Sequence, residues 1–232
     1  MCFKCRLSAF YSCSLYKFCA SSSFFIADCF STMTDPVNAA KPPAHSHNEK
    51  EASSWVKRWS HLVKPGGRVL DVACGHGRHA LWFHQLNHPV VVVDRSQDAV
   101  DGIAIAALAC KKIVADIENR PWPLAGQQFD AVVVTNYLWR PLFPALLASL
   151  APGGVLMYET FAIGNETLGK PSNPQFLLRP GELVEVCQNL RIVGFEDGFL
   201  SSTNNAVARF VQRIAAVNMP AATPEPVRYL LA

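Results

Sequence analysis

Apolar residues along the chain form short continuous runs or stripes at helical spacing, separated by polar and glycine-containing stretches. The four valines at 90–93 are typical of a strand buried on both faces, because such strands carry few polar residues. Trp55, Trp59, Leu62 and Val63 instead recur at i, i+4, i+7 and i+8, which predicts one buried face of a helix. This helix either packs on a sheet or forms a lid whose tryptophans wall a cleft.

The predicted strands and helices alternate, which favours an α/β fold with a doubly wound, mostly parallel sheet and helices on both faces. The last two predicted strands are joined by a connection too short for a parallel crossover, so we expect an antiparallel hairpin at one edge of a seven-stranded sheet. The strands are expected at 69–72, 89–95, 111–117, 129–136, 154–161, 191–197 and 208–217, and the helices at 78–87, 97–108, 141–150 and 181–190.

Length and composition favour one enzyme domain. The chain has 232 residues, of which 50% are hydrophobic, and this is ample for a single core. The net charge of +3 and the lack of a Lys/Arg run give no clear sign of nucleic-acid binding. We expect no membrane association, and the oligomeric state stays open.

The first part of the chain differs in composition from the rest. Five of the eight cysteines lie within the first 29 residues, among serines, phenylalanines and scattered basic residues that interrupt any signal-peptide core. We predict that residues 1–32 are an extension unneeded for folding or activity, that 33–50 form a linker, and that 51–232 form the enzyme domain. The few later cysteines favour a reduced, cytoplasmic location.

A strand at 69–72 runs directly into a Gly75-x-Gly77 turn and then a helix. Such glycines let the backbone approach a ligand, and the helix directs free N–H groups toward it. Asp71 lies at the end of the strand, where its carboxylate would repel the pyrophosphate of a dinucleotide but attract an ammonium group. The turn therefore favours a ligand of the aminoacyl type.

This segment resembles motif I of the class I S-adenosylmethionine (AdoMet) dependent methyltransferases, in which three alternating glycines follow an acidic residue. Ala73 stands in place of the first glycine. The resemblance extends over about 50–218 and is closest to small-molecule methyltransferases of type 11, type 25 and the tellurite-resistance group. It implies AdoMet as cofactor and methyl transfer to a small-molecule acceptor.

Further polar residues are expected at the same edge of the sheet, because ligands bind outside the carboxyl ends of such strands. Asp94 follows Gly75 by nineteen residues and can accept both hydroxyls of a ribose. Asp116 can accept from an adenine amine while Ile117 packs on the ring, and Asn136 resembles the family's motif IV position. The predicted cofactor-binding residues are Asp71, Ala73, Cys74, Gly75, Gly77, Arg78, Asp94, Arg95, Asp116, Ile117 and Asn136.

The connection at 162–180 is unusually long for a compact domain and carries apolar anchors, which favours a functional role. Within it, Asn165, Glu166 and Arg179 are predicted to shape the acceptor pocket. In-line attack on an activated sulfonium needs mainly alignment and desolvation, so no catalytic triad and no metal are expected.

Glu159, His79 and Tyr137 are the candidates for a general base, should the acceptor need one. Two other functions stay open. One is an NAD(P)-dependent oxidoreductase that uses the same turn, and the other is an AdoMet-binding protein without catalytic activity.

Overall fold

The structure is a computed structural model that describes residues 51–202, 207–220 and 227–231. The predicted extension at 1–32 and the predicted linker at 33–50 lie outside these residues. Among the residues described, no helix is long and apolar enough to cross a membrane.

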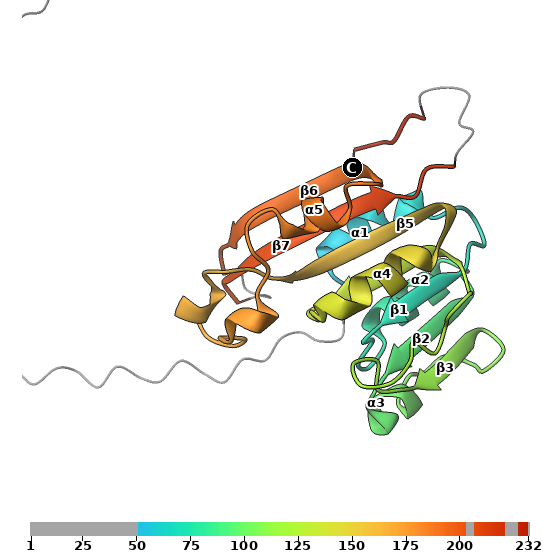
Figure 1. The fold of residues 1–232 in the computed structure, drawn as a ribbon. Coiled ribbons are helices and arrows are strands. Elements are labelled where there is room, and N and C mark those ends of the chain that lie inside the picture. Colours follow the sequence, from blue (N-terminus) through green and yellow to red (C-terminus); the bar gives the residue numbers. More distant parts are fainter. Residues whose placement is uncertain (1–50, 203–206, 221–226, 232) are drawn as a thin grey trace, which may run out of the picture. The chain divides into compact units, whose positions relative to one another are not determined.

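The described residues form a seven-stranded sheet in the order β3-β2-β1-β4-β5-β7-β6, which confirms the predicted fold class. Adjacent strands from β3 to β5 are parallel, while β7 runs antiparallel between β5 and β6 as the predicted edge hairpin requires (Figure 1). The strand order reverses between β1 and β4, where a doubly wound sheet opens a crevice for ligands. The strands are β1 Val69–Val72, β2 Val90–Asp94, β3 Cys110–Val114, β4 Phe129–Thr135, β5 Leu150–Phe161, β6 Arg191–Leu200 and β7 Arg209–Val217.

Helices cover both faces of this sheet, with α4 and α5 in front and α1 behind in Figure 1. Side chains alternate across each strand, so Leu70 and Val72 pack with α4 and α5 while Val69 packs with α1 and α2. The helices are α1 Ser54–Trp59, α2 Arg78–Gln85, α3 Gln97–Asp101, α4 Phe143–Ala148 and α5 Glu182–Val186, with 3₁₀ turns η1 Ser60–Leu62, η2 Arg140–Leu142, η3 Asn165–Thr167 and η4 Pro174–Phe176.

Two predicted helices are longer than the observed ones. The helix expected at 97–108 ends at Asp101, where Gly102 caps it, and the buried Ile103 and Ile105 then lie in an irregular segment. The helix expected at 181–190 covers only Glu182–Val186. Each segment still buries some of its apolar residues, such as Ile103 and Leu183, while Leu108 and Val184 are exposed.

Helix α1 packs against the sheet and does not form a lid. Trp55 and Trp59 are 2% and 1% exposed within the core on this face. The indole N–H of Trp55 also donates to the carbonyl of Ile214 in β7 at 3.1 Å. The packing interpretation is therefore correct for both tryptophans, and only the residue before the helix, Ser53, reaches the site described next.

Candidate active site

The glycine turn after β1 has the backbone conformation that its sequence predicts. Gly75 and Gly77 have φ of +51° and +70°, which favour glycine, and a Cβ on Gly77 would lie 2.8 Å from the side chain of Ile103. Ala73 adopts φ of +51° although it is not glycine. Asp94 fixes the turn by accepting a hydrogen bond from the Gly75 N–H at 2.8 Å.

Asp71 lies beneath this turn and is 1% exposed. Its carboxyl accepts a hydrogen bond from the Ala80 N–H at 3.1 Å, in the first turn of α2. Burial raises the pKa of Asp71 to about 8, although the Ala80 hydrogen bond and the charge of Arg78 oppose the shift. Burial therefore favours the neutral acid at neutral pH, and the Asp71 carboxyl lines neither of the two cavities at this edge of the sheet.

Two cavities adjoin at the carboxyl ends of the strands, and Ala73 lines both. The first has a volume of about 330 Å³ and is lined by Asp94, Asp116 and Glu118 among others. The second, of about 390 Å³, lies over the glycine turn and is lined by Arg78 and Arg209 but by no carboxylate among the described residues. We call them the acidic cavity and the basic cavity.

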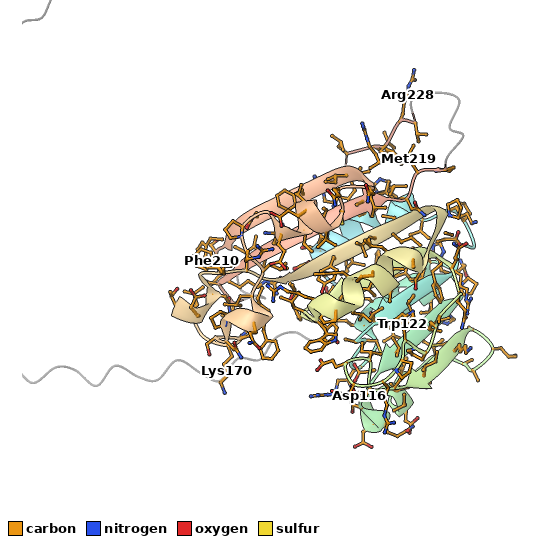
Figure 2. The ribbon with its side chains drawn as sticks, viewed as in Figure 1. Asp116, Trp122, Lys170, Phe210, Met219 and Arg228 are labelled. Carbon is orange, nitrogen blue, oxygen red and sulfur yellow. The ribbon has the colours of Figure 1, made fainter. Side chains whose placement is uncertain are left out.

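The acidic cavity contains the groups that were predicted to hold a nucleoside. Asp116 accepts hydrogen bonds from the side chain and backbone of Asn119 and from the Glu118 N–H, and these bonds lower the pKa of its carboxyl. Ile117 is buried beside it. Asp116 lies on the loop beyond β3 (Figure 2).

Tyr137 and Phe176 complete the acidic cavity from two other segments. Burial, and then the negative charge of Glu118, raise the pKa of the Tyr137 phenol well above its ordinary value. Tyr137 is therefore a neutral wall of this cavity at physiological pH.

The predicted cofactor residues converge as expected, with two exceptions. Asp71 and Gly77 line neither cavity, because Asp71 is buried beneath the turn and Gly77 faces Ile103. The residues that do line one or both cavities are Ala73, Cys74, Gly75, Arg78, Asp94, Arg95, Asp116, Ile117 and Asn136.

His79 lies in the wall of the basic cavity, but its ring is already engaged. The Ser53 backbone N–H donates to Nε2 at 3.2 Å, so the neutral ring carries its proton on Nδ1, which lies 3.5 Å from the Thr135 hydroxyl. Burial and the charge of Arg78 lower the pKa of His79 to about 3. The imidazole is therefore neutral and held in one tautomer.

Glu159, in β5, is 2% exposed and joins three distant segments. It accepts a hydrogen bond from the Ser53 hydroxyl and another from Arg209 Nη2 at 2.9 Å, the latter within an ion pair. Both carboxylate oxygens are thus engaged. Sequence reasoning missed Ser53 and Arg209, because no local pattern links residues so far from Glu159 in the chain.

The three residues predicted to shape the acceptor pocket are not brought together. Asn165 is buried and binds the Phe210 N–H and the Pro171 carbonyl, beside a small cavity that Arg209 also lines. Glu166 accepts from the nearby Gly164 N–H. The Arg179 side chain is 63% exposed, pairs with acidic residues of α5, and lines none of these three cavities.

Comparisons with known proteins agree with this geometry. Residues 69–154 match a family profile described as a methyltransferase domain. The malonyl-[acyl-carrier protein] O-methyltransferase of Serratia marcescens is 31% identical over 107 residues, which are 44% of this chain and 41% of that protein. The chain thus matches less than half the length of this relative.

Solved structures share the fold at low sequence identity. TehB from Haemophilus influenzae has a TM-score of 0.57 at 18% identity, covering 70% of this chain and 60% of its own. A SAM-dependent methyltransferase from Methanosarcina mazei has a TM-score of 0.56 at 14% identity, covering 73% and 99%. Residues 69–154 are thus similar to a methyltransferase domain, and the described part of the chain shares the fold of these solved structures.

Proposed function

We propose that this protein transfers a methyl group from AdoMet to a small-molecule acceptor. The observation that carries the proposal is the pair of adjoining cavities, one acidic and one basic, on either side of Ala73. Ribose hydroxyls and an adenine amine are donors and fit the carboxylates of the acidic cavity. The methionyl carboxylate is an anion and fits Arg78 of the basic cavity.

Individual residues are assigned to parts of the cofactor in this proposal. Asp94 accepts from the ribose, since each of its oxygens receives one backbone N–H and keeps a further lone pair. Asp116 and Ile117 hold the adenine, with Arg95 at the same wall. Gly75, Cys74 and Arg78 surround the methionyl group, while Asn136 lies at the boundary with the acceptor.

The reaction is an in-line displacement. The acceptor atom forms a bond to the methyl carbon while the carbon–sulfur bond breaks. The electron pair of the broken bond stays on sulfur and converts the sulfonium to the thioether of S-adenosylhomocysteine. Alignment and exclusion of water supply most of the catalysis. A base is needed only for an acceptor that is protonated at neutral pH. Of the three candidates, His79 and Glu159 already accept hydrogen bonds within the protein, and Tyr137 keeps its proton because its pKa is raised.

Calorimetry tests the proposal directly. We expect AdoMet and S-adenosylhomocysteine to bind the full chain and NAD(P) not to bind. Binding of NAD(P) in preference to both would overturn the proposal in favour of an oxidoreductase.

Transfer is then measured with AdoMet carrying a radioactive methyl group and a panel of small-molecule acceptors, including carrier-linked acyl groups because one relative is named for such a substrate. Label in any acceptor supports methyltransferase activity. Cofactor binding with no label in any acceptor would instead favour a protein that binds AdoMet without catalysis.

A further inference from the structure

We propose that the methyl acceptor is an anion and that Arg209 binds its carboxylate or equivalent oxyanion in the basic cavity. The inference rests on the proposed function, since it concerns the acceptor half of the same site. Arg209 begins β7 and lines both the basic cavity and the small cavity beside Asn165. It therefore stands at the side of the site that faces the 162–180 connection.

Most donors of Arg209 have no partner among the described residues. Within the described residues its hydrogen bonding consists of the single contact from Nη2 to Glu159, and its Nε is buried without a partner. A guanidinium has five N–H donors in a rigid fork that matches the two oxygens of a carboxylate. Polar groups that are buried only for stability usually have hydrogen-bond partners. An arginine that lines a cavity while several of its N–H groups lack partners is therefore expected to bind a ligand.

The surrounding contacts hold the guanidinium in place. Glu159 receives the Ser53 hydroxyl on its other oxygen, so the carboxylate cannot turn away from Arg209. The Arg209 side chain is 19% exposed and that of Glu159 is 3% exposed. Arg209 is thus oriented before a ligand arrives, which reduces the loss of side-chain entropy on binding.

Charge counting also favours an anionic acceptor. Glu159 offsets the charge of Arg209, and the carboxylate of AdoMet offsets the ammonium group of the same cofactor. The sulfonium charge then remains beside a cavity whose described lining has no carboxylate. An anionic acceptor would compensate this positive charge, whereas a cationic acceptor would be repelled.

The test uses the full chain saturated with S-adenosylhomocysteine and pairs of probes that differ in charge. Benzoate is compared with benzamide, succinate with succinamide, and inorganic phosphate tests an oxyanion that is not a carboxylate. We expect each carboxylate to bind at least about tenfold more tightly than its amide, as for a charge-assisted hydrogen bond. Phosphate binding that competes with benzoate would assign the site to oxyanions in general, which also supports the proposal.

Variants separate this role from a structural one. The double variant Arg209→Gln/Glu159→Gln removes the pair without leaving a buried charge, and it should lose the preference for carboxylates while still binding S-adenosylhomocysteine. Arg209→Lys should keep part of the preference. Arg213→Gln is the matched control, since Arg213 lies on the same strand, pairs with Glu196 and lines none of the three cavities, so it should keep the full preference.

Two negative results have different meanings. If the wild-type protein binds S-adenosylhomocysteine but binds amides as tightly as carboxylates, the anionic-acceptor inference is wrong and the proposed function stands. The same conclusion follows if the double variant retains the preference. If S-adenosylhomocysteine itself does not bind, the proposed function fails first.

Discussion

Gly75 and Gly77 share one turn, but an added methyl group would affect them differently. We expect Gly77→Ala to lower the free energy of unfolding by about 2 kcal/mol, because it combines left-handed strain with a contact to Ile103 at 2.8 Å. Gly75→Ala meets nothing within 4 Å, so only the strain of about 1 kcal/mol applies to folding. Its methyl group would stand at the wall of the basic cavity and weaken S-adenosylhomocysteine binding.

Urea unfolding and calorimetry distinguish the two variants of this turn. Ala73→Gly is the matched control, because it relieves a positive φ at the same turn and should not lower stability by the amount seen for Gly77→Ala. Equal losses of stability in Gly75→Ala and Gly77→Ala would show that Ile103 does not restrict this turn.

Asp71 gives the protein an unusual dependence on pH. Its pKa is about 8 in the folded state, against 3.8 ordinarily, so between pH 4 and 8 Asp71 is protonated in the folded protein and ionised in the unfolded chain. The Asp71 contribution to the free energy of unfolding therefore falls as pH rises, by up to about 1.4 kcal/mol per unit, and is constant above pH 8.

His79 acts in the opposite direction over a lower range. Its pKa falls from 6.5 to about 3 on folding, so its contribution to stability rises with pH between 3 and 6.5. Of these two contributions to stability, only that of Asp71 still changes from pH 6.5 to 8. We expect Asp71→Asn to gain stability relative to the wild type across pH 4 to 8, by about 2 kcal/mol between pH 6.5 and 8.

Denaturant titrations at each pH measure this difference. A difference between Asp71→Asn and the wild type that stays constant from pH 4 to 8 would show that Asp71 is ionised in the folded protein.

The sequence predicted the positions of site residues well where a residue type has a single backbone conformation or a single chemical role to fill. The two glycines and the carboxylates of Asp94 and Asp116 are such cases, and they lie where the pattern predicts. The sequence did not predict the burial of Asp71 and the raised pKa that follows from it, because burial depends on the packing of α2 over β1. Local sequence carries no signal for that packing.

The connection between β5 and α5 depends on one arginine that sequence analysis did not single out. Arg140 donates to the carbonyls of Gln175 and Leu177 and forms a bidentate pair with the buried Glu182. Burial alone would raise the pKa of Glu182, but the hydrogen bonds from Arg140 and the Arg179 N–H hold it below its ordinary value. Arg140 thus ties the 162–180 connection to the start of α5.

We expect Arg140→Met to lower the free energy of unfolding by about 2 kcal/mol, because it leaves Glu182 buried without its main partner. The figure is below the usual cost of breaking a buried pair, since the Arg140 side chain is 37% exposed. Adding Glu182→Gln should recover part of the loss. Urea unfolding measures both, and limited proteolysis should show faster cleavage within 162–180 in Arg140→Met.

Arg179→Ala is the control for this element, because its pairs with Glu182 and Glu185 are exposed on the arginine side. It should change stability by no more than about 0.5 kcal/mol. A loss as large as that of Arg140→Met would contradict the role assigned to Arg140. Unchanged acceptor turnover in Arg179→Ala would also count against the predicted role of Arg179 in acceptor binding.

At the scale of elements, strands were easier to predict than helices. A buried parallel strand such as 90–94 reads as an uninterrupted apolar run, and little else produces that pattern. Helix length was overestimated in α3, because the helix ends at Asp101 and the irregular segment that follows buries Ile103 and Ile105. Periodicity reports which residues are buried more reliably than which backbone buries them.

The mostly parallel sheet with its antiparallel edge hairpin was predictable because connection lengths restrict strand direction, whereas the strand order was not predicted. Helical crossovers between the early strands allow only parallel pairs, and the short last connection allows only an antiparallel one. The Ser53, Glu159 and Arg209 contacts were not predictable in this way. They join positions separated by 106 and 50 residues, which only the completed sheet brings together.

The residues that build the two cores indicate how much of the chain the fold needs. The described sheet and both of its cores are built from residue 52 onward, including Trp55 and Trp59 of α1. We therefore expect a chain that begins at Met33 to keep the free energy of unfolding of the full chain within about 0.5 kcal/mol, as for surface changes that leave the core intact. It should also keep its affinity for S-adenosylhomocysteine.

A chain that begins at Lys64 is the control for this truncation. It lacks both tryptophans and Ser53, so it exposes a face of the core and breaks the hydrogen bonds to His79 and Glu159. Removing two buried tryptophans costs about 3–5 kcal/mol for each, which is comparable to the whole stability of a domain, so this chain should not fold. Circular dichroism and urea unfolding compare the three chains. If the chain from Met33 behaves like the chain from Lys64, residues 1–32 are required for folding and are not a dispensable extension.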